Sequence, residues 1–245
     1  MQQKTERSAN KNLLWLKNPS KISKIIKMSD MIFAGNQFLS DYAYPFNKNI
    51  VIVPTTIDTE EYKPITRESN SEKVCIGWSG SFTTIDHFSF AIPALKIIKQ
   101  KYMEKVFFKV IGDGSYSNEE LGIKGIAWNK QDEIKELSTI DIGIMPLPDD
   151  EWSKGKCGLK GLQYMALGIP TIMSSVGVNK VIIKDGVNGF LASEIDEWVS
   201  KISKLIEDKD LRMKMGKAGR VTVLENYSVD SQKSNYLKYF NQISK

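Results

Sequence analysis

The chain is poor in the two residue types that most often bind metals or form disulfides. It has one histidine and two cysteines among its 245 residues. A single histidine excludes a multi-histidine metal site. Two isolated cysteines, Cys75 and Cys157, form neither a disulfide framework nor a zinc-ligand pattern. The sequence therefore predicts no metal site, and it favours a reducing, cytoplasmic setting.

Long apolar runs are also lacking. No run approaches the roughly 20 residues of a membrane-spanning helix, and the polar residues 1–12 have no apolar core of a signal peptide. Residues 13–28 are amphipathic, with interspersed lysines and an interruption at Pro19. Two interpretations stay open for this stretch. It is either a helix lying on a membrane surface, which would make the protein membrane-peripheral, or an ordinary helix with a packed apolar face and solvated lysines.

Charge of one sign is only mildly in excess. The formal net charge is +5, and 41% of the residues are hydrophobic. That hydrophobic content is typical of a globular chain with a core, and the positive excess favours anionic partners such as phosphates. No sustained stretch interleaves basic and aromatic residues, so the sequence predicts no nucleic-acid partner.

Short apolar segments alternate with helical patterns along most of the chain. Two strands, at residues 31–34 and 49–53, flank a helix that Asn36 caps. A polar linker at residues 55–71 separates them from a second series of strands at residues 73–78, 106–111, 123–127, 140–145 and 171–173. The tail is helical, at residues 195–207, 211–225 and 231–243. The pattern predicts an α/β fold with a doubly wound, Rossmann-like parallel sheet, preceded by a partial α/β segment.

One segment combines a basic loop, a short helix and a strand. Lys154 and Lys156 lie in a glycine-containing loop at residues 154–158, and Lys160 follows in a helix predicted for residues 159–167. A glycine loop that opens a helix presents unpaired N–H groups and the positive end of the helix dipole, which favour an anion. An ordinary connection with solvated lysines is the open alternative.

Other loops that leave the predicted strands should meet this segment at one edge of the sheet. Most of their residues also have simpler interpretations. Gly80 and Gly114 serve equally as turn glycines, and Trp128 as a core residue. His87 is interpreted as a helix residue rather than a base. The acidic run at residues 149–151 is predicted to be a solvated loop.

Residues 158–170, GLKGLQYMALGIP, resemble the signature region of the retaining, nucleotide-sugar-dependent glycosyltransferases of the GT-B fold, the family of glycosyl transferases group 1. Residues 163–170 take the place of that family's Glu-Ala-Met-Ala-x-Gly-x-Pro. Its two glutamates, eight positions apart, fall here on Gly155 and Gln163. The first replacement removes the usual sugar contact, and the second leaves a neutral partner for a ribose hydroxyl. The resemblance extends over about residues 29–243.

The resemblance implies a site for a nucleoside-diphosphate sugar, which is a substrate, and no cofactor. The residues that it places against this donor are Gly80, Ser81, Asp113, Gly114, Trp128, Gly158, Leu159 and Gln163. The family's usual arginine or lysine after the first glycine loop is missing from residues 79–90. Lys156 and Lys160 are therefore the predicted catalytic residues, because cations stabilise the charge that develops on a departing diphosphate.

By the same resemblance, residues 1–63 are a remnant of an N-terminal acceptor domain with its linker. Residues 64–227 are the donor-binding domain, and residues 228–245 a C-terminal helix. We expect a fragment or truncated product that binds nucleotide weakly and transfers no sugar alone. Its partners would be the donor, a glycan or lipid-linked acceptor in polysaccharide synthesis, and the missing N-terminal domain. A non-catalytic nucleotide-binding or interaction domain and a sugar-nucleotide epimerase are the alternatives. A dinucleotide-binding dehydrogenase is disfavoured, because no Gly-x-Gly-x-x-Gly follows the strand at residue 73.

Overall fold

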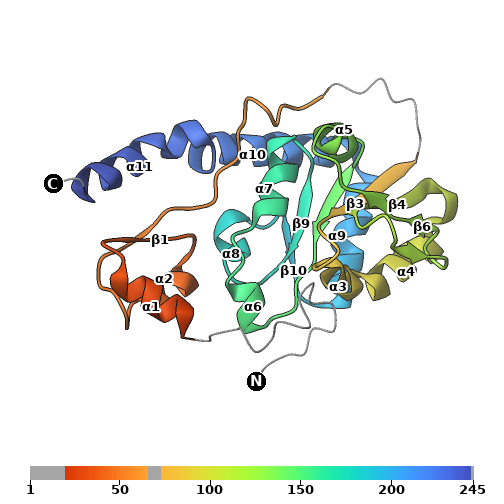
Figure 1. The fold of residues 1–245 in the computed structure, drawn as a ribbon. Helices are drawn as coiled ribbons and strands as arrows, with labels where there is room; N and C mark the ends of the chain where they lie inside the picture. The colour runs from red at the N-terminus through yellow and green to blue at the C-terminus, as the bar shows by residue number, and fades with distance from the viewer. Residues whose placement is uncertain (1–19, 66–72, 244–245) are drawn as a thin grey trace.

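The structure is a computed structural model that describes residues 20–65 and 73–243. Its centre is a six-stranded, all-parallel sheet with the strand order β10-β9-β8-β3-β4-β7 (Figure 1). The strands are β3 (Val74–Ser79), β4 (Val106–Gly112), β7 (Ile126–Ala127), β8 (Ile142–Met145), β9 (Thr171–Ser174) and β10 (Phe190–Ala192). The predicted doubly wound parallel sheet is confirmed.

Helices cover both faces of this sheet. Buried residues of α3 (Ile85–Phe88), α4 (Ile92–Tyr102) and α9 (Ile195–Glu207) form one core with the sheet residues Val74, Ile76 and Trp78. On the other face, α5 (Glu133–Ser138) and α7 (Leu159–Ala166) pack on Cys75, which alternates with those residues along β3. α10 (Lys209–Asn226) also lies on this face, where its Val223 packs with Leu162 of α7. Burial on both faces explains the continuous apolar runs in the sequence.

The boundaries of several elements differ from the prediction. The predicted strand at residues 123–127 is divided into β6 (Ile123–Lys124) and β7, and β6 pairs with a short antiparallel strand, β5 (Ser117–Asn118). Pro93 lies in the first turn of α4, where its missing N–H costs no helical hydrogen bond. Two short 3-10 turns, η2 (Ser89–Ala91) and η3 (Met103–Lys105), flank that helix.

Two short helices were not predicted. The acidic run that was predicted to be a solvated loop leads into α6 (Glu151–Lys154), and α8 (Asn179–Ile182) lies between β9 and β10. The acidic run is therefore not simply a solvated loop. Its Asp150 caps α6, because its Oδ1 accepts a hydrogen bond of 2.7 Å from Ser153 N.

The N-terminal segment forms a small unit beside the main sheet. It comprises α1 (Lys21–Met28), β1 (Ile32–Ala34), α2 (Gln37–Ala43) and β2 (Ile50–Ile52), and the two strands pair in parallel. The predicted strand–helix–strand unit is confirmed, as is the Asn36 cap. Residues 13–19 of the predicted amphipathic stretch lie outside the described residues. In α1, Ile26 is buried whereas Ile22, Ile25 and Met28 are exposed.

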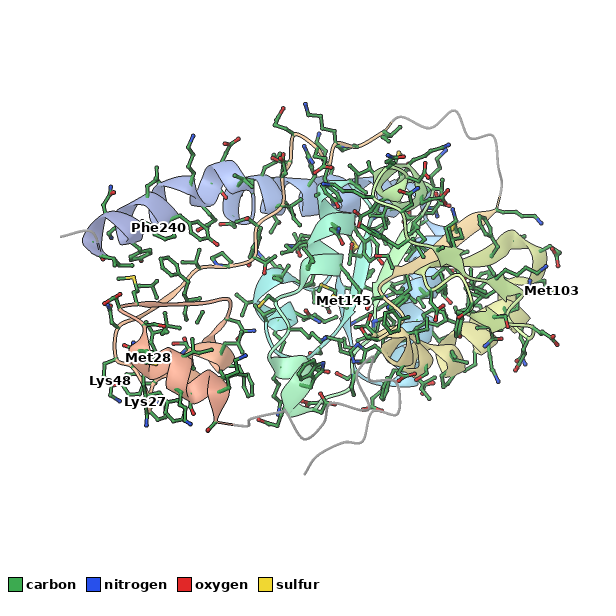
Figure 2. The ribbon with its side chains drawn as sticks, in the orientation of Figure 1. Lys27, Met28, Lys48, Met103, Met145 and Phe240 are labelled. Carbon is green, nitrogen blue, oxygen red and sulfur yellow. The ribbon has the colours of Figure 1, made fainter. Side chains whose placement is uncertain are left out.

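The last helix returns to this segment. α11 (Val229–Ile243) crosses over β1, and its Phe240 faces that strand (Figures 1 and 2). The ring of Phe33 in β1 stacks on Phe240 at a centroid distance of 5.2 Å and on Tyr236 at 5.9 Å. The linker also contacts the start of α11, since Val229 N donates to Ile57 O at 3.1 Å. Among the described helices, none is both long and apolar enough to cross a bilayer.

Candidate functional site

The order of the strands defines where a ligand of this sheet would lie. After β3 the chain runs outward to β4 and β7, and it then returns to the other side of β3 to form β8, β9 and β10. The loops that leave β3 and β8 therefore diverge at the carboxyl ends of the strands, where a ligand of such a sheet is expected, and we call this expected ligand position the crevice. The loop after β3 and the loop before α7 flank this crevice.

Two glycines bring the loops after β3 and β4 together. A Cβ atom at Gly80 would lie 2.1 Å from the buried ring of Trp78, and one at Gly112 would lie 1.9 Å from Gly80 O. Gly80 N donates to Ile111 O at 2.9 Å, and Ser81 N donates to Thr84 Oγ1 at 3.0 Å. The amides of Gly80 and Ser81, two residues that were predicted to lie against the donor, are thus engaged within the protein in this conformation.

α7 begins at the same crevice. Gly158 precedes it with a φ of 74°, a left-handed value, and a Cβ atom there would lie 2.3 Å from Ile182 Cδ1. Only glycine fits this position without strain. The first amides of α7 have no intrahelical partners, and the positive end of the helix dipole lies with them. Leu159, the first residue of the helix, is exposed.

Two lysines lie beside this helix start. Lys160 Nζ donates to Thr84 Oγ1 at 3.3 Å and lies 5.0 Å from the centroid of the Trp78 ring. Burial, and secondarily the positive charge of Lys156, lowers the pKa of Lys160 to about 8. Burial also lowers the pKa of Lys156, although the Asp150 carboxylate opposes this shift. Burial disfavours the charged form of both lysines, and a bound anion would stabilise that form.

Lys154 behaves differently from these two lysines. Its Nζ lies 3.4 Å from Glu151 Oε1 and 3.6 Å from Asp149 Oδ1, in an exposed group of charges. The sequence predicted that Lys154, Lys156 and Lys160 would together surround an anion. The structure instead leaves Lys154 paired with the acidic run. Lys160 lies in the first turn of α7, whereas Lys156 Nζ lies 5.1 Å from the centroid of the Trp152 ring in α6.

His87 belongs to the same group of charges and was not predicted as a site residue. Its pKa is lowered by burial and then by the charges of Lys156 and Lys160, against weaker opposing effects of Asp150 and Asp86. Its Nδ1 atom is buried and has no hydrogen-bond partner among the described residues. Burial and the charges of the two lysines therefore favour the neutral form of this imidazole. A lone histidine seven positions after Gly80 was the available signal in the sequence.

The predicted nucleoside contacts lie at the ends of β4 and β7. The Asp113 carboxylate accepts hydrogen bonds from Ser115 N at 2.9 Å and from Ser115 Oγ at 2.6 Å, which fixes the turn after β4. A Cβ atom at Gly114 would lie 3.0 Å from Ala127 Cβ, so this turn contacts the end of β7. Trp128 follows with 52% of its surface exposed. The alternative of a core tryptophan is therefore wrong.

Gln163 is engaged with the linker. Its Nε2 donates to Tyr62 Oη at 2.8 Å and to Glu133 Oε1 at 3.2 Å, and Tyr62 Oη donates to Glu133 Oε2 at 3.1 Å. These three bonds close a ring between α7, the linker and α5. The predicted contact of Gln163 with a ribose hydroxyl stays a prediction. Within the described residues, no group of three or more acidic, histidine or cysteine side chains is arranged to hold a metal ion.

Two known proteins are similar to this chain over most of its length. The chain is 25% identical over 232 residues to the N-acetyl-alpha-D-glucosaminyl L-malate synthase of Bacillus anthracis, covering 86% of this chain and 59% of that protein. It is 21% identical over 203 residues to the UDP-Gal:alpha-D-GlcNAc-diphosphoundecaprenol alpha-1,3-galactosyltransferase of Escherichia coli, covering 74% of this chain and 51% of the relative. The chain thus spans between half and two thirds of these two relatives.

The fold is also found in solved structures. A glycosyltransferase from Rickettsia africae superimposes with a TM-score of 0.73 at 18% identity, over 94% of this chain and 68% of that one. A sequence profile for the glycosyl transferases group 1 matches residues 73–208, which include the crevice, both lysines and α7. From this match over more than half of its length, the chain belongs to the glycosyl transferases group 1 family.

Proposed function

We propose that this chain is the donor-binding part of a glycosyltransferase that transfers a sugar from a nucleoside diphosphate to an acceptor. One observation carries the proposal. Lys156 and Lys160 lie half-buried beside the start of α7, at the crevice between the loops of β3 and β8. A diphosphate at this position would stabilise the charged form of both lysines and accept hydrogen bonds from the first amides of the helix.

In this proposal the lysines act on the leaving group. When the bond between the sugar C1 atom and the diphosphate oxygen breaks, negative charge grows on the diphosphate. Fixed cations and helix amides that meet this growing charge lower the barrier of the step. The two lysines thereby replace the cation that the family usually carries after the first glycine loop. Asp113, Gly114 and Trp128 would hold the nucleoside at the ends of β4 and β7, and Gln163 would approach it from α7.

We assign residues 1–63 to the domain that would bind the acceptor. The name of the Escherichia coli relative, which specifies a diphosphoundecaprenol-linked sugar, supports a lipid-linked acceptor in polysaccharide synthesis. α1 supports contact with a membrane surface, because exposed Ile22, Ile25 and Met28 alternate with lysines along it. The donor domain at residues 64–227 and the helix at residues 228–245 complete the proposed division of a cytoplasmic, membrane-peripheral enzyme.

The test is calorimetric titration of the chain with UDP, GDP and ADP, followed by the same titration of Lys156→Met and Lys160→Met. We expect one base to be preferred, and each substitution to weaken binding by about tenfold or more, because a charge-assisted phosphate contact is lost. Lys154→Met is the matched control, since its ammonium already pairs with Asp149 and Glu151. Unchanged affinity in folded Lys156→Met and Lys160→Met would refute the assignment.

Catalysis is tested separately from binding. We expect the 245-residue chain alone to bind donor without transferring sugar, and transfer to require residues outside it. Efficient transfer by this chain would contradict the proposed division. Absence of binding by all three nucleotides would favour the non-catalytic interaction domain over the transferase, and the family match favours the transferase over an epimerase.

A further inference from the structure

One side chain of the N-terminal segment reaches the loop that carries Lys156. Asn36, only 5% exposed, lies between β1 and α2. Its Oδ1 accepts a hydrogen bond of 2.9 Å from Leu39 N and so caps α2. Its Nδ2 donates to Lys156 O at 2.9 Å and to Lys154 O at 3.2 Å. A single carboxamide therefore joins two parts of the chain that lie about 120 positions apart in the sequence.

The backbone around Asn36 also packs closely against this loop. A Cβ atom at Gly35 would lie 2.5 Å from Cys157 Sγ, so a side chain at position 35 would displace the thiol. Asn36 Nδ2 itself lies 3.8 Å from the same sulfur. Figure 1 shows the resulting arrangement, in which α2 lies beside α6, and a Cβ atom at Gly155 would lie 3.6 Å from Leu39 Cδ2 of α2. The turn before α2 thus covers one side of the loop at residues 154–158, which we call the lysine loop.

The bonded carbonyls lie on either side of Gly155, and one of them belongs to Lys156 itself. Within the loop, Lys156 N donates to Ser153 O at 3.0 Å, which fixes the residue from the α6 side. The bond from Asn36 to Lys156 O fixes the next peptide group, between Lys156 and Cys157. Lys156 is therefore held at both of its peptide groups. Its side chain starts from a backbone position that these hydrogen bonds restrain. Small displacements of a cation relative to a phosphate cost considerable binding energy.

We propose that Asn36 is a positioning residue that holds the lysine loop and sets Lys156 for the anion. It makes the geometry of the anion site depend on the position of the N-terminal segment. The binding part of this inference rests on the proposed donor site, whereas the contact between Asn36 and the loop does not. No other polar side chain of residues 20–53 donates to the loop at residues 154–158 among the hydrogen bonds of the described residues.

The test uses Asn36→Ser, because a serine hydroxyl still caps α2 but offers no amide to the two carbonyls. Its first readout is the rate at which a thiol reagent labels Cys157 in the whole chain. Cys75 is fully buried and serves as the internal reference for unfolding. We expect Asn36→Ser to raise the labelling rate of Cys157 about tenfold while Cys75 stays protected, because loss of the two bonds frees the loop.

The second readout is affinity for the nucleotide that the unmodified chain prefers. We expect Asn36→Ser to weaken it about tenfold, and Asn36→Asp to weaken it further, because a carboxylate would face two carbonyl oxygens. Asp208→Ala is the matched control. It removes the cap bond from Leu211 N to Asp208 Oδ1, 2.8 Å long, at the start of α10. We expect it to lower stability without changing either readout.

The outcomes separate the two claims. If Cys157 of Asn36→Ser is labelled at the same rate as Cys157 of the unmodified chain, the carboxamide does not hold the loop and the inference is overturned. Faster labelling with unchanged nucleotide affinity would overturn the positioning role. If the unmodified chain binds no nucleoside diphosphate, the proposed function fails together with the binding part of the inference, and labelling still decides whether Asn36 holds the loop.

Discussion

At the scale of single residues, the chemistry of the site depends on how deeply two lysines are buried. Lys160 contacts Thr84 and the Trp78 ring, and its pKa falls to about 8. The sequence predicted that these lysines belong to one anion site, because both flank a helix start. It did not predict the burial, which requires Trp78 from a strand about 80 positions earlier.

The lowered pKa of Lys160 predicts a pH dependence of stability. In the unfolded chain this pKa returns to its ordinary value of 10.5, against about 8 in the folded protein. Between these values the unfolded state binds more protons, so the free energy of unfolding rises with pH. Denaturant titrations at pH 7, 8.5 and 10 should show wild type gaining stability relative to Lys160→Met. A difference that is constant across this range would contradict the assignment.

Close packing around Gly80 predicts that a side chain at this position destabilises the fold. An alanine Cβ there would lie 2.1 Å from the ring of Trp78, which is fully packed. We expect Gly80→Ala to destabilise the fold by about 1–3 kcal/mol, the usual cost of overpacking, as measured by denaturant titration. Gly155→Ala is the control, since the nearest atom to its Cβ would lie at 3.4 Å. Equal stability of the two variants would show that the β3 loop adapts more easily than its packing implies.

At the scale of elements, the strands and long helices followed from apolar periodicity and caps, whereas the shortest elements did not. α6 and α8 have four residues each, about one helical turn, and neither length allows a periodic pattern to be recognised. The β5–β6 hairpin consists of two-residue strands. The missed α6 matters most, because its Asp150 cap and its last residue, Lys154, set the beginning of the lysine loop.

The contact between α11 and Phe33 predicts that this one ring holds the helix in place. Among the described residues of this helix none is fully buried, and it contacts the N-terminal segment largely through rings packed on Phe33. We expect Phe33→Ala to release α11, with amide hydrogen exchange about tenfold faster or more along residues 229–243 and little change in α7. Leu237→Ala, at a position that is 54% exposed, is the control. Unchanged exchange in Phe33→Ala would mean that other contacts hold the helix.

At the scale of the whole molecule, the N-terminal segment and the proposed donor site are connected by contacts that no local pattern in the sequence predicts. Asn36 was predicted only as a helix cap, and its second role depends on a loop 118 positions away. Gln163 was assigned to a ribose hydroxyl, yet its amide donates to Tyr62 of the linker and to Glu133. Residues that were predicted to act alone thus take part in the contacts between segments.

The central claim is that Lys156, Lys160 and the start of α7 bind a diphosphate, and proton uptake on binding tests it most directly. Calorimetric titrations at pH 8 in buffers of different ionisation enthalpy measure this uptake. With a pKa of about 8, Lys160 is about half protonated before binding and fully protonated beside a diphosphate. We predict uptake of about half a proton per nucleoside diphosphate bound at pH 8, abolished in Lys160→Met and preserved in Lys154→Met. Binding without proton uptake, or uptake that survives in Lys160→Met, would contradict the account.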